Sequence, residues 1–208
     1  MEFLNWCKMK DWIGDKNSTY KTLGASSHTD EERAENDYYA TPPKAVDMLL
    51  LLEGFSTNIW EVACGGGHIS KVIVEAGHTV KSTDLYDRGF GESEIDFLKV
   101  KGKWDGDIIS NPPYKYAQEF VEKSLQVITQ GHKVAMFLKI QFLEGKKRKK
   151  MFLKYPPKTV YVSSSRLLCA KNGKFGKGKG FIKSSAVAYC WFLWTKGYTG
   201  NTIIKWFN

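Results

Sequence analysis

Four consecutive residues, Asn111-Pro112-Pro113-Tyr114, carry side chains suited to binding a flat group with an amine. The asparagine offers a carbonyl acceptor, and the tyrosine ring offers a plane for stacking. Each proline fixes φ and lacks an N–H, so nearby carbonyl oxygens can face a pocket instead of a strand partner. The tetrapeptide therefore predicts a site that grips an amino group by its edge and its ring by its face. A proline-rich turn is the simpler interpretation of the four residues alone.

A glycine-rich turn upstream favours the binding interpretation. Residues 59–63 are typical of a strand, Gly65-Gly66-Gly67 of a turn, and 68–76 of a helix. Glycines let the backbone approach a ligand closely, and the start of the following helix presents free N–H groups. The sequence therefore predicts a nucleotide-binding turn, in which Ala63 and Cys64 are small, apolar neighbours of the ligand.

Two acids strengthen this prediction. Asp84 ends the strand predicted over 79–84, seventeen residues after Gly67, and an acid at that place commonly binds the hydroxyls of a ribose. Asp96 falls near an expected third strand, where it could accept a hydrogen bond from an adenine amino group while Phe97 packs on the ring. For each acid the alternative is a solvated carboxylate at the end of a strand.

Strands and helices must position these residues. Strands predicted over 59–63, 79–84, 105–110 and 133–139 alternate with helices over 42–53, 68–76, 117–129 and 143–153, and late strands follow over 159–162 and 186–194. This alternation predicts an α/β layered domain with a mostly parallel sheet. The last segment is so apolar that we interpret it as a buried strand, with base stacking by Trp191 or Trp194 as the lesser alternative.

The bulk composition narrows the function classes. The chain has 208 residues, enough for one domain with a substantial core. Its 31 Lys and Arg against 22 Asp and Glu give a net charge of +9, which favours a polyanionic partner. The four cysteines show no zinc-ligand spacing, and no apolar run or leader pattern indicates a membrane span or a signal peptide. We therefore expect no metal, no membrane and a cytoplasmic location.

The positive charge is concentrated in two late segments. We predict basic loops at 145–150 and 171–183 that contact nucleic-acid phosphates, with a solvated helix face as the alternative for the first. The candidate nucleic-acid contacts are Lys146, Lys147, Arg148, Lys149, Lys150, Arg166, Lys171, Lys174, Lys177 and Lys179.

Together these motifs resemble the Rossmann-like S-adenosylmethionine-dependent DNA methyltransferases that modify adenine N6, most nearly the small phage type. The glycine-rich motif is matched by residues 61–67, the catalytic motif by 111–114, and an upstream Thr-Pro segment by 39–42, in the gamma-like order. The resemblance covers roughly residues 37–195. It implies a class I three-layer sandwich with a mostly parallel seven-stranded sheet whose last strand is antiparallel. Residues 1–36 are expected to form a peripheral arm and 37–208 the methyltransferase domain.

The resemblance also implies a cofactor, a partner and roles for individual residues. The cofactor is S-adenosyl-L-methionine, the product is S-adenosyl-L-homocysteine, and the partner is DNA or, alternatively, RNA, in the host cytoplasm if the chain is phage-encoded. The catalytic residues would be Asn111, Pro112, Pro113 and Tyr114. The cofactor-binding residues would be Tyr39, Thr41, Pro42, Glu61, Ala63, Cys64, Gly65, Gly67, Asp84, Leu85, Asp96, Phe97 and Asn111.

Two departures from the family pattern and several alternatives stay open. Glu61 stands where the family usually has Asp, which affects the expected contact to the cofactor's amino group. The chain has no room for a large target-recognition domain. The same tetrapeptide chemistry serves methylation of RNA bases, of protein glutamine and of cytosine N4. A nucleic-acid-binding module without turnover is the alternative from another functional class.

Overall fold

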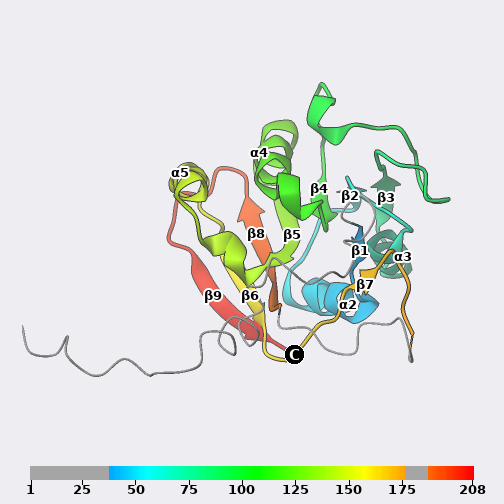
Figure 1. The fold of residues 1–208 in the computed structure, drawn as a ribbon. Helices are drawn as coiled ribbons and strands as arrows, with labels where there is room; N and C mark the ends of the chain where they lie inside the picture. The colour runs from blue at the N-terminus through cyan, green and yellow to red at the C-terminus, as the bar shows by residue number, and fades with distance from the viewer. Residues whose placement is uncertain (1–37, 177–186) are drawn as a thin grey trace, which may run out of the picture. The chain divides into compact units, whose positions relative to one another are not determined.

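A seven-stranded sheet forms the centre of the computed structural model, which describes residues 38–176 and 187–208. The predicted arm over 1–36, together with Lys177 and Lys179, therefore lies outside the described residues. The strand order is β3-β2-β4-β5-β8-β6-β9 (Figure 1). Only β8 runs antiparallel to the other strands of this sheet, which confirms the predicted mostly parallel α/β architecture. The strands are β2 (Asn58–Glu61), β3 (Thr79–Ser82), β4 (Asp107–Ser110), β5 (Lys133–Lys139), β6 (Thr159–Ser163), β8 (Tyr189–Thr195) and β9 (Ile203–Phe207).

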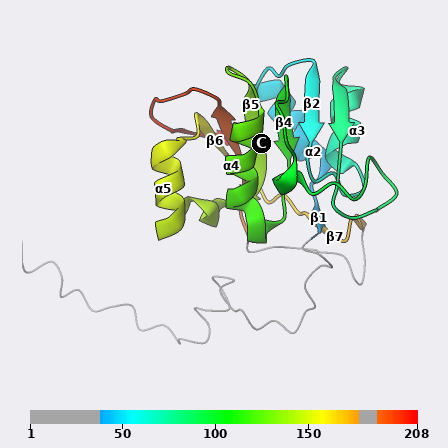
Figure 2. The same ribbon diagram turned by 90° about the horizontal axis from the view of Figure 1, so that it is seen from above.

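Helices cover both faces of the sheet and complete three layers (Figure 2). One apolar cluster joins α2 (Pro43–Leu52) and α3 (His68–Glu75) to one face, and a second joins α4 (Ala117–Val127) and α5 (Lys146–Lys154) to the other. Successive strand residues supply opposite faces: Ile59 packs in the first cluster and Trp60 in the second. The alternation of strands and helices along the chain thus produces the expected sandwich.

The late apolar strand β8 is buried on both faces. Trp191 and Trp194 are 0% and 1% exposed, and each indole N–H has a partner, the carbonyl of Ala45 and that of Tyr155 respectively. A strand covered on both sides reads as a continuous apolar run. The buried-strand prediction is confirmed, and neither ring is exposed for stacking with a base.

The edges of the sheet differ from the prediction. The third strand expected near Asp96 is absent from the described residues; that region contains an isolated bridge between Thr83 and Glu92 and the 3-10 helix η3 (Phe97–Lys99). Several glycines in this loop have positive φ, which interrupts an extended strand. The seventh strand is instead β9, paired in parallel with β6 at the opposite edge.

The sheet order reverses between β2 and β4. From β2 the chain continues to β3 on one side, and from β4 to β5 on the other. Ligands of open α/β sheets bind at such a switch point, outside the carboxyl ends of the strands. Here the carboxyl end of β2 leads into the glycine turn, and that of β4 leads into Asn111. The topology therefore places the two predicted motifs side by side.

A second, two-stranded sheet connects distant parts of the chain. The strand β1 (Tyr39–Ala40) pairs antiparallel with β7 (Ala170–Lys171). The backbone N–H of Asn172 also donates to the carbonyl of Tyr38, at 3.0 Å. This pairing holds the upstream Thr-Pro segment against the start of the second basic segment.

Candidate active site

The Asn111 side chain is oriented by one hydrogen bond and leaves its carbonyl oxygen unpaired. Its Nδ2 donates to the Tyr39 carbonyl at 2.7 Å, while Oδ1 is buried without a partner among the described residues. A buried acceptor that lacks a partner costs about 1–3 kcal/mol. A ligand that donates an N–H group to Asn111 Oδ1 would remove this free-energy cost.

Other unpaired polar atoms belong to the same corner. Of the six buried side-chain atoms without a hydrogen-bond partner in the described residues, four belong to Thr41, Ser110, Asn111 and Tyr114. Unsatisfied buried groups are few in native proteins, and a concentration of them points to a bound group that satisfies them. The predicted Thr-Pro segment and the catalytic tetrapeptide therefore share a region suited to a polar ligand.

The Tyr114 ring is fixed by neighbours from three other segments. It stacks with Tyr39 at a centroid distance of 5.9 Å and an interplanar angle of 27°, and it contacts the ring of Tyr189 at 6.2 Å. The Lys139 ammonium lies 4.6 Å from its centroid. Burial raises the pKa of the Tyr114 phenol well above its usual value, so the hydroxyl stays protonated. Base stacking by Tyr114 stays a prediction. No motif in the sequence indicated Lys139. Its contact with the Tyr114 ring forms only when β5 packs beside the segment that follows β4.

Asp84 holds the glycine turn. Its Oδ2 accepts the Gly65 N–H at 2.8 Å and its Oδ1 accepts the Tyr86 N–H at 2.9 Å. Gly65 and Gly67 have φ of +54° and +77°, in the left-handed region that favours glycine. An ionised carboxylate offers about four lone-pair sites, so these two bonds leave acceptor capacity for the ribose hydroxyls that the sequence predicts.

Glu61 is an internal support for helix α3. Its carboxyl group is 1% exposed and accepts hydrogen bonds from the Ser70 N–H, at 2.8 Å, and from the Ser70 hydroxyl. Ser70 also contacts Ser82 at 2.6 Å. Burial raises the pKa of Glu61 to about 8, against the opposing effect of the Ser70 hydrogen bonds. These bonds direct the carboxyl group of Glu61, which is one methylene longer than Asp, to the first turn of α3. A contact between Glu61 and a cofactor stays a prediction.

Two aromatic rings that the sequence motifs did not include lie on the glycine turn. The Tyr38 hydroxyl accepts the Gly66 N–H at 2.9 Å, and a Cβ at Gly65 would lie 2.3 Å from the Tyr38 ring. A Cβ at Gly67 would lie 2.5 Å from the Phe90 ring. Tyr38 directly precedes the matched Thr-Pro segment, and this position is the one feature of the sequence that could have indicated its contact with the turn.

The remaining small or apolar candidates border the turn. Cys64 is 4% exposed, and burial raises the pKa of its thiol to about 12, which agrees with a steric role and not with reactivity. Ala63 is partly buried against the α4 side of the core. Thr41 is 1% exposed, Pro42 caps α2, and Leu85 is 49% exposed beside Asp84.

The predicted adenine contacts need a correction. Phe97 is 1% exposed and packs against Trp60 and Phe120 at centroid distances of 5.4 Å for both pairs. Its ring therefore belongs to the core and not to a ligand surface. Asp96 accepts the Leu98 N–H at 3.1 Å and pairs with Lys99 at 2.9 Å, so its described contacts cap its own 3-10 turn.

The first basic segment is a helix and not a loop. Lys146, Lys147, Lys149 and Lys150 are exposed on α5, which begins directly after Gly145. Arg148 differs from them because its guanidinium donates to the carbonyls of Glu144 and Gln141. The helix prediction over 143–153 was therefore right in kind, and the loop assignment for 145–150 was wrong.

The second basic segment is described only up to residue 176. Lys171 belongs to β7, and Lys174 follows it as an exposed residue. A Cβ at Gly173 would lie 2.8 Å from the Tyr38 hydroxyl, and Phe175 contacts His68 at 5.2 Å between ring centroids. This part of the segment therefore lies beside the glycine turn. Arg166 is exposed in the stretch that follows β6.

Between 38 and 176 and between 187 and 208, no group of three or more His, Cys, Asp and Glu side chains could hold a metal ion. None of the helices in those two ranges combines the length and the apolar character that crossing a bilayer requires.

Solved structures of similar fold place the architecture in a known class. A protein from Listeria monocytogenes described as a class I S-adenosylmethionine-dependent methyltransferase is 12% identical, with a TM-score of 0.59 over 92% of this chain and 71% of that one. A protein from Pyrococcus horikoshii described as an RNA methyltransferase is 14% identical, with a TM-score of 0.56 over 88% and 99%. The modification subunit of a type I restriction enzyme from Vibrio vulnificus is 12% identical, with a TM-score of 0.55 over 89% and 48%.

At these identities the likeness defines the fold alone. The chain has the Rossmann-like fold of the class I methyltransferases, as the strand order and the three layers had indicated. No protein-family model matches the sequence, and no curated protein sequence matches it.

Proposed function

We propose that this protein is an S-adenosylmethionine-dependent methyltransferase that methylates the exocyclic N6 amino group of adenine in DNA. The observation that carries the proposal is the buried Oδ1 of Asn111 at the carboxyl end of β4, which has no hydrogen-bond partner within residues 38–176 and 187–208. An acceptor at that place suits a substrate that brings an N–H group. The fold, which many methyltransferases share, supports the reaction class.

The described residues fit the cofactor. The glycine turn has the positive φ values that a close backbone approach requires. Thr41 contributes a buried hydroxyl oxygen that has no partner in the part of the chain that the structure describes. Tyr39, Thr41 and Pro42 would bind the methionine end, and Asp84 with Leu85 the ribose side. When bound, S-adenosyl-L-methionine supplies an electrophilic methyl group on a sulfonium. The Tyr38 hydroxyl accepts the Gly66 N–H in this structure. A cofactor that binds this amide would therefore have to displace the hydroxyl.

Asn111 and Pro112 would activate the amine. The lone pair of an exocyclic adenine nitrogen is delocalised into the ring, which makes it a poor nucleophile. Two acceptors, Asn111 Oδ1 and the Pro112 carbonyl, would bind its two N–H groups and favour a tetrahedral nitrogen with a localised lone pair. Tyr114 would fix the plane of the base. Held in this way by Asn111 and Pro112, the nitrogen would accept the methyl group that S-adenosyl-L-methionine supplies, the sulfur would keep the electron pair of the broken carbon–sulfur bond, and the proton would pass to water.

Positioning would supply most of the rate enhancement. Fixed dipoles and a near-attack arrangement are each worth several kcal/mol in enzymes. The Asn111 amide is preorganised by Tyr39, and the Tyr114 ring by Tyr39, Tyr189 and Lys139. No strong base is needed before transfer, since the proton leaves after the nitrogen becomes cationic. An adenine in duplex DNA would have to flip out of the stack to reach this site.

Charge favours a nucleic acid over a protein tail as the substrate. The net charge is +9, and the exposed lysines of α5 form a contiguous basic surface. DNA is supported by the fold likeness to a restriction-modification subunit, and the likeness to a protein described as an RNA methyltransferase makes RNA the alternative.

The decisive experiment is methyl transfer from labelled S-adenosylmethionine to unmodified DNA, RNA and protein in parallel, followed by nucleoside mass spectrometry. We expect label in DNA as N6-methyladenine. Label in N4-methylcytosine or in RNA would keep the chemistry and change the substrate. Label found only in protein would refute the nucleic-acid assignment.

A further inference from the structure

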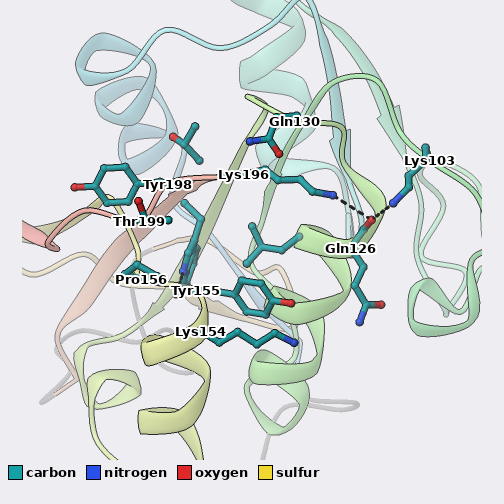
Figure 3. A pocket seen from close by; sticks show the side chains of 13 residues that line it. Lys103, Gln126, Gln130, Lys154, Tyr155, Pro156, Lys196, Tyr198 and Thr199 are labelled. Atoms are coloured by element: carbon teal, nitrogen blue, oxygen red, sulfur yellow. Dashed lines mark hydrogen bonds between the residues drawn. The ribbon is translucent and has the colours of Figure 1, made fainter.

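A pocket of about 450 Å³ is lined by none of the residues of the Asn-Pro-Pro-Tyr segment, and Figure 3 shows the side chains that do line it. It lies beside Thr195, which pairs with Lys133 at the start of β5, so it belongs to the amino-end edge of the parallel strands. Three lysines from three separate segments line it: Lys103, Lys154 and Lys196. Among the described residues that line this pocket there is no Asp or Glu.

Two of these lysines are held in place by the end of α4. The Lys103 ammonium donates to the Gln126 carbonyl at 2.7 Å, and the Lys196 ammonium donates to the Ile128 carbonyl at 2.7 Å and to that of Gln126 at 3.5 Å. Figure 3 shows the two ammonium groups approaching the Gln126 oxygen from different sides. An ammonium has three N–H donors, so donors remain for a ligand.

These cations are close enough to repel each other. Burial lowers the pKa of Lys196, and the neighbouring charge of Lys103 lowers it further. Like charges held together in a concave site without a lining carboxylate raise the local concentration of anions. The pocket is therefore suited to a negatively charged group, such as a phosphate.

A groove between α4 and α5 adjoins this pocket. It has a volume of about 490 Å³ and is lined by Lys146, Lys147, Lys150 and Lys154, with Glu122 as its one acid among the described residues. Lys146, Lys150 and Lys154 recur every fourth residue, which places them on one face of α5, about 6 Å apart along the axis. Lys154 lines both cavities.

The groove and the pocket together form a lysine track, which we define as Lys103, Lys146, Lys147, Lys150, Lys154 and Lys196. Its first end, at Lys146, follows the carboxyl end of β5, on the same edge of the sheet as Asn111. Its second end is the pocket at the opposite edge. The track thus runs along the α4 and α5 layer from the carboxyl-end edge of the sheet, which carries the candidate active site, to the amino-end edge.

We propose that the lysine track binds the sugar-phosphate backbone of the nucleic-acid substrate where the strand extends beyond the active site. The identity of the substrate rests on the proposed function. Two adjoining cavities lined by six lysines suit a chain of phosphates, whereas a single anion would occupy only one of them. Such contacts give affinity without reading sequence.

The test is binding of a fluorescent DNA duplex across a series of salt concentrations. The variant K150E/K154E removes two cations from the track. The matched variant K44E/K205E makes the same charge change elsewhere: Lys44 is in α2, and the Lys205 ammonium lies 5.9 Å from the ring of Tyr161, in the core cluster of that layer. We expect K150E/K154E to bind at least tenfold more weakly and to reduce the slope of log K against log salt by about 1.8, at about 0.9 per phosphate contact.

The control separates the track from net charge. K44E/K205E should change affinity and slope much less than K150E/K154E. Equal effects of the two variants, no effect of K150E/K154E, or no DNA binding by the unmodified protein would each overturn the proposal. Inorganic phosphate and chloride should displace DNA similarly at equal ionic strength. If phosphate displaces DNA far more effectively, the pocket is a small-anion site and the proposal is overturned. A melting curve for each variant verifies folding.

Failure of the track and failure of the proposed function give different results. Methyl transfer to DNA with unchanged binding by K150E/K154E would refute the track alone. Track-dependent DNA binding without methyl transfer to any nucleic acid would refute the proposed function and leave the track.

Discussion

The side-chain amide of Asn111 donates a 2.7 Å hydrogen bond to the backbone carbonyl of Tyr39, a residue 72 positions earlier in the chain. The bond fixes which side of the amide faces the protein, because the nitrogen is occupied by Tyr39. The oxygen is thereby left for a ligand. β1 in turn is held by β7, so the orientation of one candidate catalytic side chain depends on two distant segments.

Replacing Asn111 by Ala should abolish most methyl transfer and leave cofactor affinity nearly unchanged. The loss of one preorganised polar group at a reacting centre typically lowers kcat by about 10²–10³-fold. Single-turnover methyl transfer measures the rate, and calorimetric titration with S-adenosylhomocysteine measures affinity.

The matched control for that variant is Asn201→Ala, in the exposed turn before β9. It should retain the activity of the unmodified protein. An equal loss of cofactor affinity and of turnover in Asn111→Ala would contradict the assigned role, since the amide would then serve the cofactor and not the amine.

Replacing Glu61 by Gln should flatten the dependence of stability on pH. The pKa of Glu61 in the folded protein is about 8, above its usual value of 4.5, so the folded state holds the proton more tightly than the unfolded state. The stability contribution is complete below about pH 4.5 and is lost as the pH rises through about 8. Within that window the slope is at most about 1.4 kcal/mol per pH unit.

Urea unfolding at several pH values between 4 and 9 checks this sign. The free energy of unfolding of the unmodified protein should fall, relative to Glu61→Gln, as the pH rises. Gln keeps a carbonyl acceptor for the Ser70 N–H, so the variant should still fold. Parallel curves for the two proteins would show that Glu61 does not titrate in this range.

Gly67→Ala should destabilise the glycine turn. The φ of Gly67 is +77°, which costs a residue with a Cβ about 1–2 kcal/mol. A Cβ there would also lie 2.5 Å from the Phe90 ring, so the ring would have to shift. Equilibrium unfolding in urea measures the loss.

Gly54→Ala is the matched control for Gly67→Ala. Gly54 has no neighbour within 4 Å of an added Cβ and no positive φ. Its substitution should change stability much less. If both variants lose the same free energy, the left-handed turn is not the cause.

Asp107→Ala should cost about 2–5 kcal/mol of stability. The Asp107 carboxylate is 2% exposed and accepts the N–H groups of Ser56, at 2.6 Å, and of Lys133, at 2.7 Å. Removing it leaves two backbone donors, one just before β2 and one at the start of β5, without that partner, at about 1–3 kcal/mol each. Thermal and urea unfolding of the variant provide the measurement.

Asp105→Ala serves for comparison, because Asp105 and Asp107 both contact His132. The Asp105 side chain is 89% exposed, so its replacement should have a far smaller effect. Similar losses from the two variants would mean that the His132 contact, and not the backbone hydrogen bonds, determines the stability of this end of the sheet.

The parts of the site that depend on local geometry could be predicted from the sequence. A glycine turn after a strand requires left-handed φ at Gly65 and Gly67, and that requirement is visible in the residue types. The two motifs meet because a parallel sheet aligns the ends of β2 and β4, which follows from strand and helix alternation. The core role of Trp191 was likewise evident from an apolar run.

The parts that depend on contacts between distant residues could not be predicted. Three residues reach the site only through tertiary packing, and no spacing in the sequence predicts their place: Tyr38, Phe90 and Lys139. The strand β9 was missed because four of its five residues are exposed, so it shows no alternation of buried and exposed side chains. In α5 the run of cations favoured a loop over 145–150 although a helix was predicted over 143–153, because Met151 is the one buried residue of this helix.

The hydroxyl of Tyr38 has a kinetic consequence. While it accepts the Gly66 N–H, any ligand that uses this amide must first displace the phenol. The apparent dissociation constant of that ligand is then its intrinsic value divided by the fraction of molecules in which the amide is free. In stopped-flow mixing, the observed rate of cofactor association should then reach a plateau at high concentration, and Tyr38→Phe should raise that plateau.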